Sequence, residues 1–326
     1  MVRTAKAVKS LKGGRPPLTS KKLSTSNHST ATTTTNEVNP RRKSAKATRK
    51  LINTHHQLHK ARAIAVAGNN QQLVRDLDTQ IEQLGGLAAY QAASLTGQDK
   101  DRGGDSSIKL VEWLRKRGLI GQQSNTGPGQ DLRVLEIGAL SSQNAISRLV
   151  GKGVRDVKRI DLHSQDKSTI EEIDFMDLPI PLHDEDKFDI VSLSLVLNYV
   201  PDVAHRGNML RRTRDFLRKL STLSETDKDE QEAREPAKDT RLPCLFVVLP
   251  LPCLSNSRYM THEHFLSIMQ HLGYESIEKH NSQKLAYMLF RLDHVQQQRD
   301  KSTVFKKIEL RPGGERNNFA IVLAPD

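Results

Sequence analysis

The chain has few cysteines, no long apolar run and no apolar leader, and each absence excludes a class of protein. Among its 326 residues, only Cys244 and Cys253 are cysteines, too few for a disulfide framework or a four-ligand zinc site. No apolar run approaches the roughly 20 residues that a membrane-spanning helix needs. The first residues contain no apolar stretch of the secretory kind, so we expect an intracellular protein in a reducing compartment with no membrane partner.

The formal net charge of +12 comes from one part of the chain. Residues 1–50 contain 13 Lys and Arg against a single acid, Glu37, an excess equal to the whole net charge. Large apolar side chains are too few there to stabilise a fold, so we predict a disordered basic tail over 1–50. Such tails typically contact nucleic acid or a nuclear import receptor; a tail that only keeps the protein soluble is the alternative.

Residues 51–105 predict a helical N-terminal extension. Apolar residues recur at three- and four-residue steps, and Gly68-Asn69-Asn70 should divide the segment into two helices. His55 and His59 lie four residues apart on the first helix, which is a metal-ligand spacing. No nearby acid or cysteine completes a site, so we expect exposed or RNA-facing histidines and no metal.

Residues 106–326 alternate strand-like and helix-like segments, which predicts an α/β domain on a mainly parallel seven-stranded sheet. An amphipathic helix is expected at 108–119, with Trp113 in the core. Residues 221–240 are almost all polar and predict a flexible insertion. Strands are expected at 133–137, 157–162, up to Asp174, 188–193 and 245–249, helices at 143–150, 206–220 and 261–273, and an antiparallel C-terminal hairpin from 285–289 and 318–323.

The turn between the first two expected strands suits a nucleoside-bearing ligand. Gly138 ends the first strand and lets a ligand approach the backbone, and Asp161 ends the second, where its carboxylate can accept hydrogen bonds from ribose hydroxyls. A dinucleotide-binding turn would place glycines where Leu140 and Gln143 stand, and these side chains exclude a close wrap around a pyrophosphate. S-adenosylmethionine has no phosphate and tolerates this turn, so it is the favoured cofactor.

Other residues in strand order fit the same ligand. Glu136 lies two residues before Gly138, near the expected cationic methionine end. Asp174 and Phe175 could bracket the adenine, the carboxylate accepting from the exocyclic amine and the ring stacking. Ser192, in the fourth strand, completes the cofactor-binding candidates. A structural turn or a helix-capping acid would explain any one of these residues, but their order favours a Rossmann-like, class I methyltransferase fold.

Two other chemistries have weaker support. The set of Asp or Asn, two prolines and an aromatic residue that directs methylation to the adenine exocyclic amine is missing after the fourth strand. Cys253 follows the fifth strand, where some RNA cytosine-C5 enzymes keep a nucleophilic cysteine. The other features of those enzymes are missing, so we interpret Cys253 as structural.

Several sequence blocks together resemble the fungal 25S ribosomal RNA adenine-N1 methyltransferases. The resemblance covers roughly residues 80–325 and excludes the basic tail and the insertion. Its blocks are L-E-I-G-A-L (135–140), R-I-D-L-H (159–163), Asp174-Phe175-Met176, F-D-I-V-S-L-S-L-V-L-N-Y-V-P (188–201), L-P-C-L-x-N-S-R-Y-M (251–260) and Tyr90-Gln91-Ala92-Ala93-Ser94.

The resemblance implies a nuclear, nucleolar enzyme that uses S-adenosylmethionine to methylate N1 of one adenine in large-subunit rRNA or a pre-ribosomal particle. Asn198, Tyr199 and Tyr259 are then candidates to hold the flipped-out base, with loop packing around the cofactor as the alternative. An animal relative binds S-adenosylmethionine as a sensor, so a non-catalytic sensor or scaffold is the alternative function. Basic residues of the expected helix 206–220 could face rRNA phosphates or simply solvent: Arg206, Arg211, Arg212 and Arg214.

Overall fold

The computed structural model describes residues 45–86, 88–89, 92–93, 104–121, 131–164, 166–219, 242–293 and 303–325. The segments predicted as a disordered tail and a flexible insertion lie outside these residues, apart from 45–50. Tyr90, Gln91 and Ser94 also lie outside them. None of the helices described is both long enough and apolar enough to cross a membrane.

Two helices form the N-terminal part, α1 (Ala45–Ala67) and α2 (Gln71–Gln83). They are separated at the predicted Gly68-Asn69-Asn70 break, where Asn69 has a φ of 53° and the Asn70 side chain caps α2 by accepting from Leu73 N. An Arg62–Asp78 ion pair joins the two helices.

The histidines of α1 differ in part from expectation. His55 is buried, with 4% of its surface exposed, so the expectation of an exposed side chain was wrong for this residue. Its ring centroid lies 4.5 Å from that of His59, which is exposed. Burial lowers the pKa of both histidines. The described residues contain no cluster of three or more His, Cys, Asp or Glu that would hold a metal ion.

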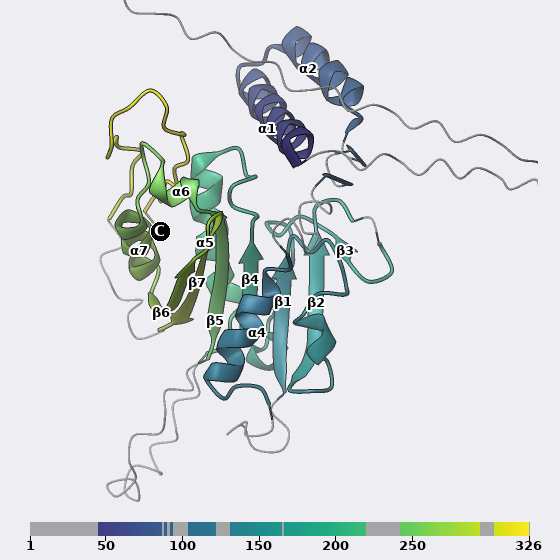
Figure 1. Ribbon diagram of the computed structural model, residues 1–326, viewed down its shortest axis with the longest axis vertical. Helices are drawn as coiled ribbons and strands as arrows, with labels where there is room; N and C mark the ends of the chain where they lie inside the picture. The colour runs from purple at the N-terminus through teal and green to yellow at the C-terminus, as the bar shows by residue number, and fades with distance from the viewer. Residues whose placement is uncertain are drawn as a thin grey trace, which may run out of the picture. The chain divides into compact units, whose positions relative to one another are not determined.

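Seven strands form one mixed sheet in the order β3-β2-β1-β4-β5-β7-β6 (Figure 1). The first five strands are parallel, and β7 runs antiparallel to both β5 and β6. This order confirms the predicted Rossmann-like fold with an antiparallel C-terminal hairpin. The strands are β1 (Leu132–Ile137), β2 (Val154–Asp161), β3 (Glu171–Glu172), β4 (Ile190–Ser194), β5 (Cys244–Pro250), β6 (Tyr274–Asn281) and β7 (Leu285–Leu292).

The strand order also places the ligand site. The chain leaves β1 towards β2 on one side and later returns to place β4 on the other side of β1. Ligands of open α/β sheets bind at such a switch point, outside the carboxyl ends of the strands. The residues that follow β1 and β4 therefore meet where a ligand is expected.

The hairpin uses a different pair of segments from the predicted one. β7 contains the expected 285–289 strand, but its partner is β6, and residues 318–323 form no strand. The C-terminal segment makes only isolated bridges, between Phe305 and Leu323 and between Ser257 and Asn317. β6 escaped prediction because it is an edge strand whose exposed residues are polar and of which only Tyr274 is buried.

The helix predicted at 143–150 is absent, and a single 3-10 turn, Ser147–Leu149, takes its place. Side chains bind the backbone N–H groups at its start: the Asp105 carboxylate accepts from Ala145 N, and Ser107 Oγ accepts from Ile146 N. Gly151 follows with a φ of 74° and ends the segment.

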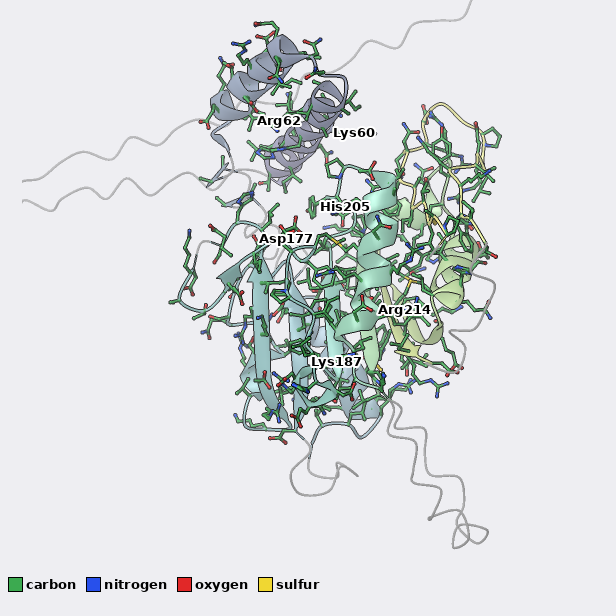
Figure 2. The ribbon with its side chains drawn as sticks, turned by 180° about the vertical axis from the view of Figure 1, so that it is seen from behind. Lys60, Arg62, Asp177, Lys187, His205 and Arg214 are labelled. Carbon is green, nitrogen blue, oxygen red and sulfur yellow. The ribbon has the colours of Figure 1, made fainter. Side chains whose placement is uncertain are left out.

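Alternate strand residues build one core on each face of the sheet. On one face, Trp113 of α4 (Ser107–Lys116) packs edge-on against Phe246 of β5, which confirms Trp113 as a core residue. On the other face, Val247 packs with side chains of α5 (Val203–Phe216) and α7 (His262–His271). Figure 2 shows α5 lying along this second face.

The two helices of the second face begin at side-chain caps. The Asp202 carboxylate accepts from His205 N at the start of α5, which therefore begins three residues before the predicted Arg206. Thr261 caps α7 as predicted, and Gly273, with a φ of 84°, follows its end.

Candidate active site

Gly138 and the loop after β4 are in direct contact at the switch point. Gly138 has a φ of 75°, and a Cβ atom at this position would lie 2.5 Å from Val196 Cγ2. Both the backbone conformation and the lack of space therefore require glycine. Beside Val196, Leu195 has a φ of 57°, an uncommon conformation for a residue with a side chain. Such backbone strain concentrates at functional sites.

Glu136 places a buried carboxylate just before this turn. Its Oε1 accepts a hydrogen bond of 2.6 Å from Asn144 Nδ2, and its Oε2 is buried without a partner among the described residues. Burial raises the pKa of Glu136 to about 7, against the opposing effect of the Asn144 amide. A buried carboxylate oxygen without a donor is a costly arrangement that a cationic ligand group would relieve.

Ser192 and Asp161 flank Glu136 on the neighbouring strands. Ser192 is the register partner of Glu136 on β4 and is 5% exposed. Asp161 ends β2, and its Oδ1 accepts from His163 N at 2.9 Å, which fixes the carboxylate at the carboxyl edge of the sheet. Burial raises the pKa of Asp161, and the His163 hydrogen bond opposes that shift.

Asp174 and Phe175 do not share one role. Asp174 lies two residues beyond β3, partly buried, with Oδ1 accepting from Met176 N at 2.8 Å. The Phe175 ring is only 3% exposed, and its centroid lies 5.1 Å from that of Phe216 in the core. The structure thus places this ring in the core, so we leave it out of the adenine contacts.

The candidate base-holding residues follow β4 and β5, two neighbouring parallel strands. Asn198 Oδ1 is buried and has no partner among the residues described. Tyr199 N donates to Val196 O at 2.8 Å, so Tyr199 belongs to the turn that contacts Gly138. Tyr259 is partly buried, and Lys307 Nζ lies over its ring, 4.5 Å from the centroid.

Three of the four arginines expected to face phosphates or solvent donate to backbone carbonyls, and one of them, Arg211, is partly exposed and donates to Ala324 O. Arg206 is 8% exposed and donates to Val200 O at 2.8 Å and to Ala320 O at 2.7 Å. Arg212 donates to the carbonyls of Phe175 and Leu178. These guanidiniums face inward because carbonyls outside regular secondary structure need donors there, so the expectation was wrong for Arg206 and Arg212.

Asp105, which was not among the predicted site residues, holds the loop after β1 in place. One carboxylate oxygen accepts from Ser107 N and Oγ, and the other accepts from Ala145 N in the loop after β1. Next to it, Ser106 Oγ lies 2.8 Å from Ser194 Oγ at the end of β4. The acid directly before two serines and an apolar helix was the available sequence signal, because this pattern is typical of a helix start.

Cys253 is unsuited to nucleophilic chemistry. The thiol is 8% exposed, and burial raises its pKa to about 12. Only the thiolate is an effective nucleophile, so a cysteine in this environment is inert at neutral pH. The structural interpretation of Cys253 agrees with these properties.

Comparisons with known proteins give one consistent result. A family model described as "25S rRNA (adenine(2142)-N(1))-methyltransferase, Bmt2" matches residues 75–321. The chain is 36% identical over 244 residues to the 25S rRNA (adenine(2142)-N(1))-methyltransferase of Saccharomyces cerevisiae, an alignment that covers 75% of this chain but only 62% of that protein. It is 33% identical over 273 residues to the 25S rRNA adenine-N(1) methyltransferase of Schizosaccharomyces pombe, covering 83% of this chain and 90% of the relative.

Solved structures resemble the chain more distantly. The N-methyltransferase NodS from Bradyrhizobium japonicum, in complex with S-adenosyl-L-homocysteine, is 13% identical, with a TM-score of 0.34 over 60% of this chain and 90% of that chain. An O-methyltransferase from neocarzinostatin biosynthesis, in complex with S-adenosylmethionine, is 11% identical, with a TM-score of 0.42 over 76% of this chain and 74% of that chain.

Proposed function

Because the chain belongs to the Bmt2 family of 25S rRNA adenine-N1 methyltransferases, which use S-adenosylmethionine, we propose that it methylates N1 of an adenine in large-subunit rRNA. The observation that carries the proposal is the carboxyl edge of the sheet, where two buried polar atoms have no partner in the described part of the chain: Glu136 Oε2 in β1 and Asn198 Oδ1 after the adjacent β4. Glu136 Oε2 suits the cationic end of the cofactor, and Asn198 Oδ1 suits an N–H group of the base.

The residues around Gly138 fit S-adenosylmethionine, which supplies an electrophilic sulfonium methyl group when bound. Glu136 would face the cationic methionine end, which accounts for its unpartnered carboxylate oxygen. Asp161 would accept from the ribose hydroxyls, and Asp174 from the exocyclic amine of the cofactor's adenine. Ser192 would line the cofactor site beside Glu136.

The target base needs positioning more than acid–base catalysis. Adenine N1 carries its own lone pair at neutral pH, so the protein needs no general base before methyl transfer, and the chain's task is to orient the base and exclude water. Asn198 Oδ1 would accept from the exocyclic N6–H of the target, which becomes more acidic as N1 is methylated. Tyr199 would hold the ring of the target adenine. N1 lies on the Watson–Crick edge, so the base must be unpaired or flipped out.

The cellular setting is part of the proposal. A substrate in 25S rRNA is made and modified in the nucleus, so we place the enzyme in the nucleolus, acting on rRNA or on a pre-ribosomal particle. The basic segment 1–50 would bind a nuclear import receptor and add sequence-independent affinity for rRNA.

The test is a methylation assay with purified protein and protein-free 25S rRNA transcribed in vitro. We expect 1-methyladenosine in the nucleoside digest, and a new primer-extension stop, since the methyl group blocks Watson–Crick pairing. The Asp161→Ala variant should give neither. A wild-type protein that binds S-adenosylmethionine but forms no 1-methyladenosine on the transcript or on precursor particles would instead support the non-catalytic sensor.

A further inference from the structure

The loop after β5 is held by a second loop from the C-terminal segment. The Arg311 guanidinium donates to four backbone carbonyls of the first loop, those of Leu254 at 2.7 Å, Ser255 at 2.8 Å, Ser257 at 3.0 Å and Met260 at 2.6 Å. These carbonyls surround Tyr259 in the sequence. One side chain therefore fixes the backbone on both sides of this tyrosine.

The first loop also binds the second through a side chain of its own. Arg258, next to Tyr259, donates to the carbonyls of Gly313 and Gly314 and to Asn318 Oδ1, at 2.9–3.0 Å. In return, its own carbonyl accepts from Leu310 N and Arg311 N. Apart from the short helix α6 (Pro252–Ser255), the two loops lack regular secondary structure, and these bonds hold them together. The guanidiniums of Arg258 and Arg311 are thus committed to the protein itself.

The lysines of the same segment face outward. Lys307 Nζ lies 4.5 Å from the Tyr259 ring centroid, and the neighbouring Lys306 is exposed. Ile308 follows, 60% exposed although apolar. The preceding Phe305 is oriented inward, with its ring 5.8 Å from His264 and 5.3 Å from His271 of α7. The segment is thus anchored by Phe305 and presents the next three residues.

We propose that Tyr259, Lys306, Lys307 and Ile308, which we call the Tyr259 surface, bind the single-stranded rRNA that flanks the target adenine. An aromatic ring, adjacent ammonium groups and an exposed apolar side chain are the elements with which proteins bind unpaired nucleic acid. Tyr259, which Lys307 contacts, lies in the loop that follows the carboxyl end of β5. The inference rests on the proposed function, because it extends that site to the neighbouring nucleotides.

The positive charge of the C-terminal segment and the rigid support of Tyr259 both favour RNA over a protein partner. Residues 303–318 contain four cationic side chains against two carboxylates, Glu309 and Glu315, so the segment is positive overall. Release of counterions from phosphates drives binding to such a surface and makes it salt-dependent. A rigid mounting lowers the entropic cost of orienting Tyr259.

The test compares two full-length double variants in binding a fluorescein-labelled oligoadenylate RNA of about 12 nucleotides, a length that matches typical single-strand sites. Lys306→Ala with Lys307→Ala should weaken binding roughly tenfold. The slope of log affinity against log salt concentration should become less negative by about 1.4, since each phosphate contact in a single strand contributes about 0.7. S-adenosylmethionine affinity, measured by calorimetry, should stay within twofold.

The matched control is Lys152→Ala with Lys187→Ala, which removes the same charge at the opposite, amino-terminal edge of the sheet; Figure 2 labels Lys187 there. It should leave RNA affinity within twofold. Equal losses in the two double variants, or unchanged affinity and salt slope in the Lys306 and Lys307 variant, would overturn the inference. RNA binding as in wild type together with loss of a protein partner from purified particles would overturn it in favour of a protein interface.

Two further variants test the aromatic contact. Tyr259→Leu should weaken oligoadenylate binding about tenfold, and Tyr259→Phe should restore it, because stacking needs the ring and not the hydroxyl. Failure of Tyr259→Phe to restore binding would count against stacking. The binding assay contains no methylation step, so a wild-type protein that binds RNA but forms no 1-methyladenosine would refute the proposed reaction and leave the Tyr259 surface supported.

Discussion

At the residue scale, Gly138 carries the most specific requirement of the site. Its φ of 75° costs a residue with a side chain about 1–2 kcal/mol, and a Cβ atom would meet Val196 Cγ2 at 2.5 Å. We expect Gly138→Ala to lower S-adenosylmethionine affinity at least tenfold in calorimetry and to reduce the free energy of unfolding in urea. Gly314→Ala, where a Cβ would meet nothing within 4 Å, should do neither. Wild-type affinity of Gly138→Ala for S-adenosylmethionine would show that this turn is not part of the cofactor site.

Glu136 predicts a dependence of stability on pH. Its folded-state pKa of about 7 lies above the ordinary value of 4.5, so the folded protein binds the proton more tightly than the unfolded chain. The stability of the ligand-free protein should therefore fall as the pH rises through this window, by up to about 3 kcal/mol. Glu136→Gln should flatten the dependence in urea unfolding between pH 5 and 8. Parallel curves for the two proteins would contradict a buried, titrating Glu136.

The same carboxylate predicts how cofactor binding responds to pH. Its ionised form would pair with the cationic methionine end, so wild-type affinity for S-adenosylmethionine should rise as the pH increases through about 7. Glu136→Gln should bind more weakly and lose the rise. Calorimetry at several pH values checks this, and a variant that keeps the rise would assign it to another group.

Cys253 gives the third residue-scale prediction. Its thiol is buried, with a pKa of about 12, so Cys253→Ala should retain the rate of 1-methyladenosine formation within about twofold. The readout is the initial rate per folded protein, with Cys244→Ala as a comparison at the other buried cysteine. An inactive but folded Cys253→Ala would revive a covalent, cytosine-directed mechanism.

At the scale of elements, the sequence predicted what local pattern encodes. The central strands β1, β4 and β5 are apolar runs, and each was predicted within two residues of its observed limits. The acids and the glycine that follow or end strands were located for the same reason. β6 was missed because an edge strand keeps polar residues, and no local pattern shows that Asp105 binds the backbone of the segment 143–150 from 40 positions away.

The arginines illustrate the same limit within the site. The distribution of charge along the sequence favoured contacts with phosphate or solvent, but the sequence contains no sign that Arg206 reaches Ala320, 114 residues later, or that Arg311 reaches Leu254, 57 residues earlier. Long-range hydrogen bonds from a side chain to a carbonyl leave no periodic signal. The sequence thus suggested residues that could touch a ligand but not the residues that hold their loops in place.

Gly207 tests how the C-terminal segment is held against α5. A Cβ atom at Gly207 would lie 1.9 Å from Val322 O, so the segment must shift in Gly207→Ala. We expect a loss of about 1–3 kcal/mol in stability, and a larger fall in methylation rate than in S-adenosylmethionine affinity. Asn208→Ala, exposed on the same helix, is the control in thermal unfolding and rate assays. A Gly207→Ala protein with wild-type stability and rate would show that the contact is dispensable.

At the scale of the whole molecule, charge is divided between residues 51–326, which are neutral overall, and the basic segment 1–50. Replacing Arg41, Arg42 and Lys43 with alanine in a fluorescent fusion should lower the nuclear-to-cytoplasmic ratio towards one, because import receptors bind such basic clusters. Methylation by the purified variant should persist. Alanines at Lys21 and Lys22 provide the comparison, and unchanged nuclear accumulation of the triple variant would place the import signal elsewhere.

The link from Arg206 to Ala320 has a consequence for how the molecule is made. Residues 317–323 are synthesised after all seven strands. Within them, Ala320 O accepts a hydrogen bond from Arg206, whose guanidinium also donates to Val200 O in the loop that carries Asn198 and Tyr199. Domains fold from the N-terminal end during translation, so the sheet can assemble while this loop still lacks its final support. The loop proposed to bind the base should therefore reach its final structure last, after these residues have left the ribosome that made them.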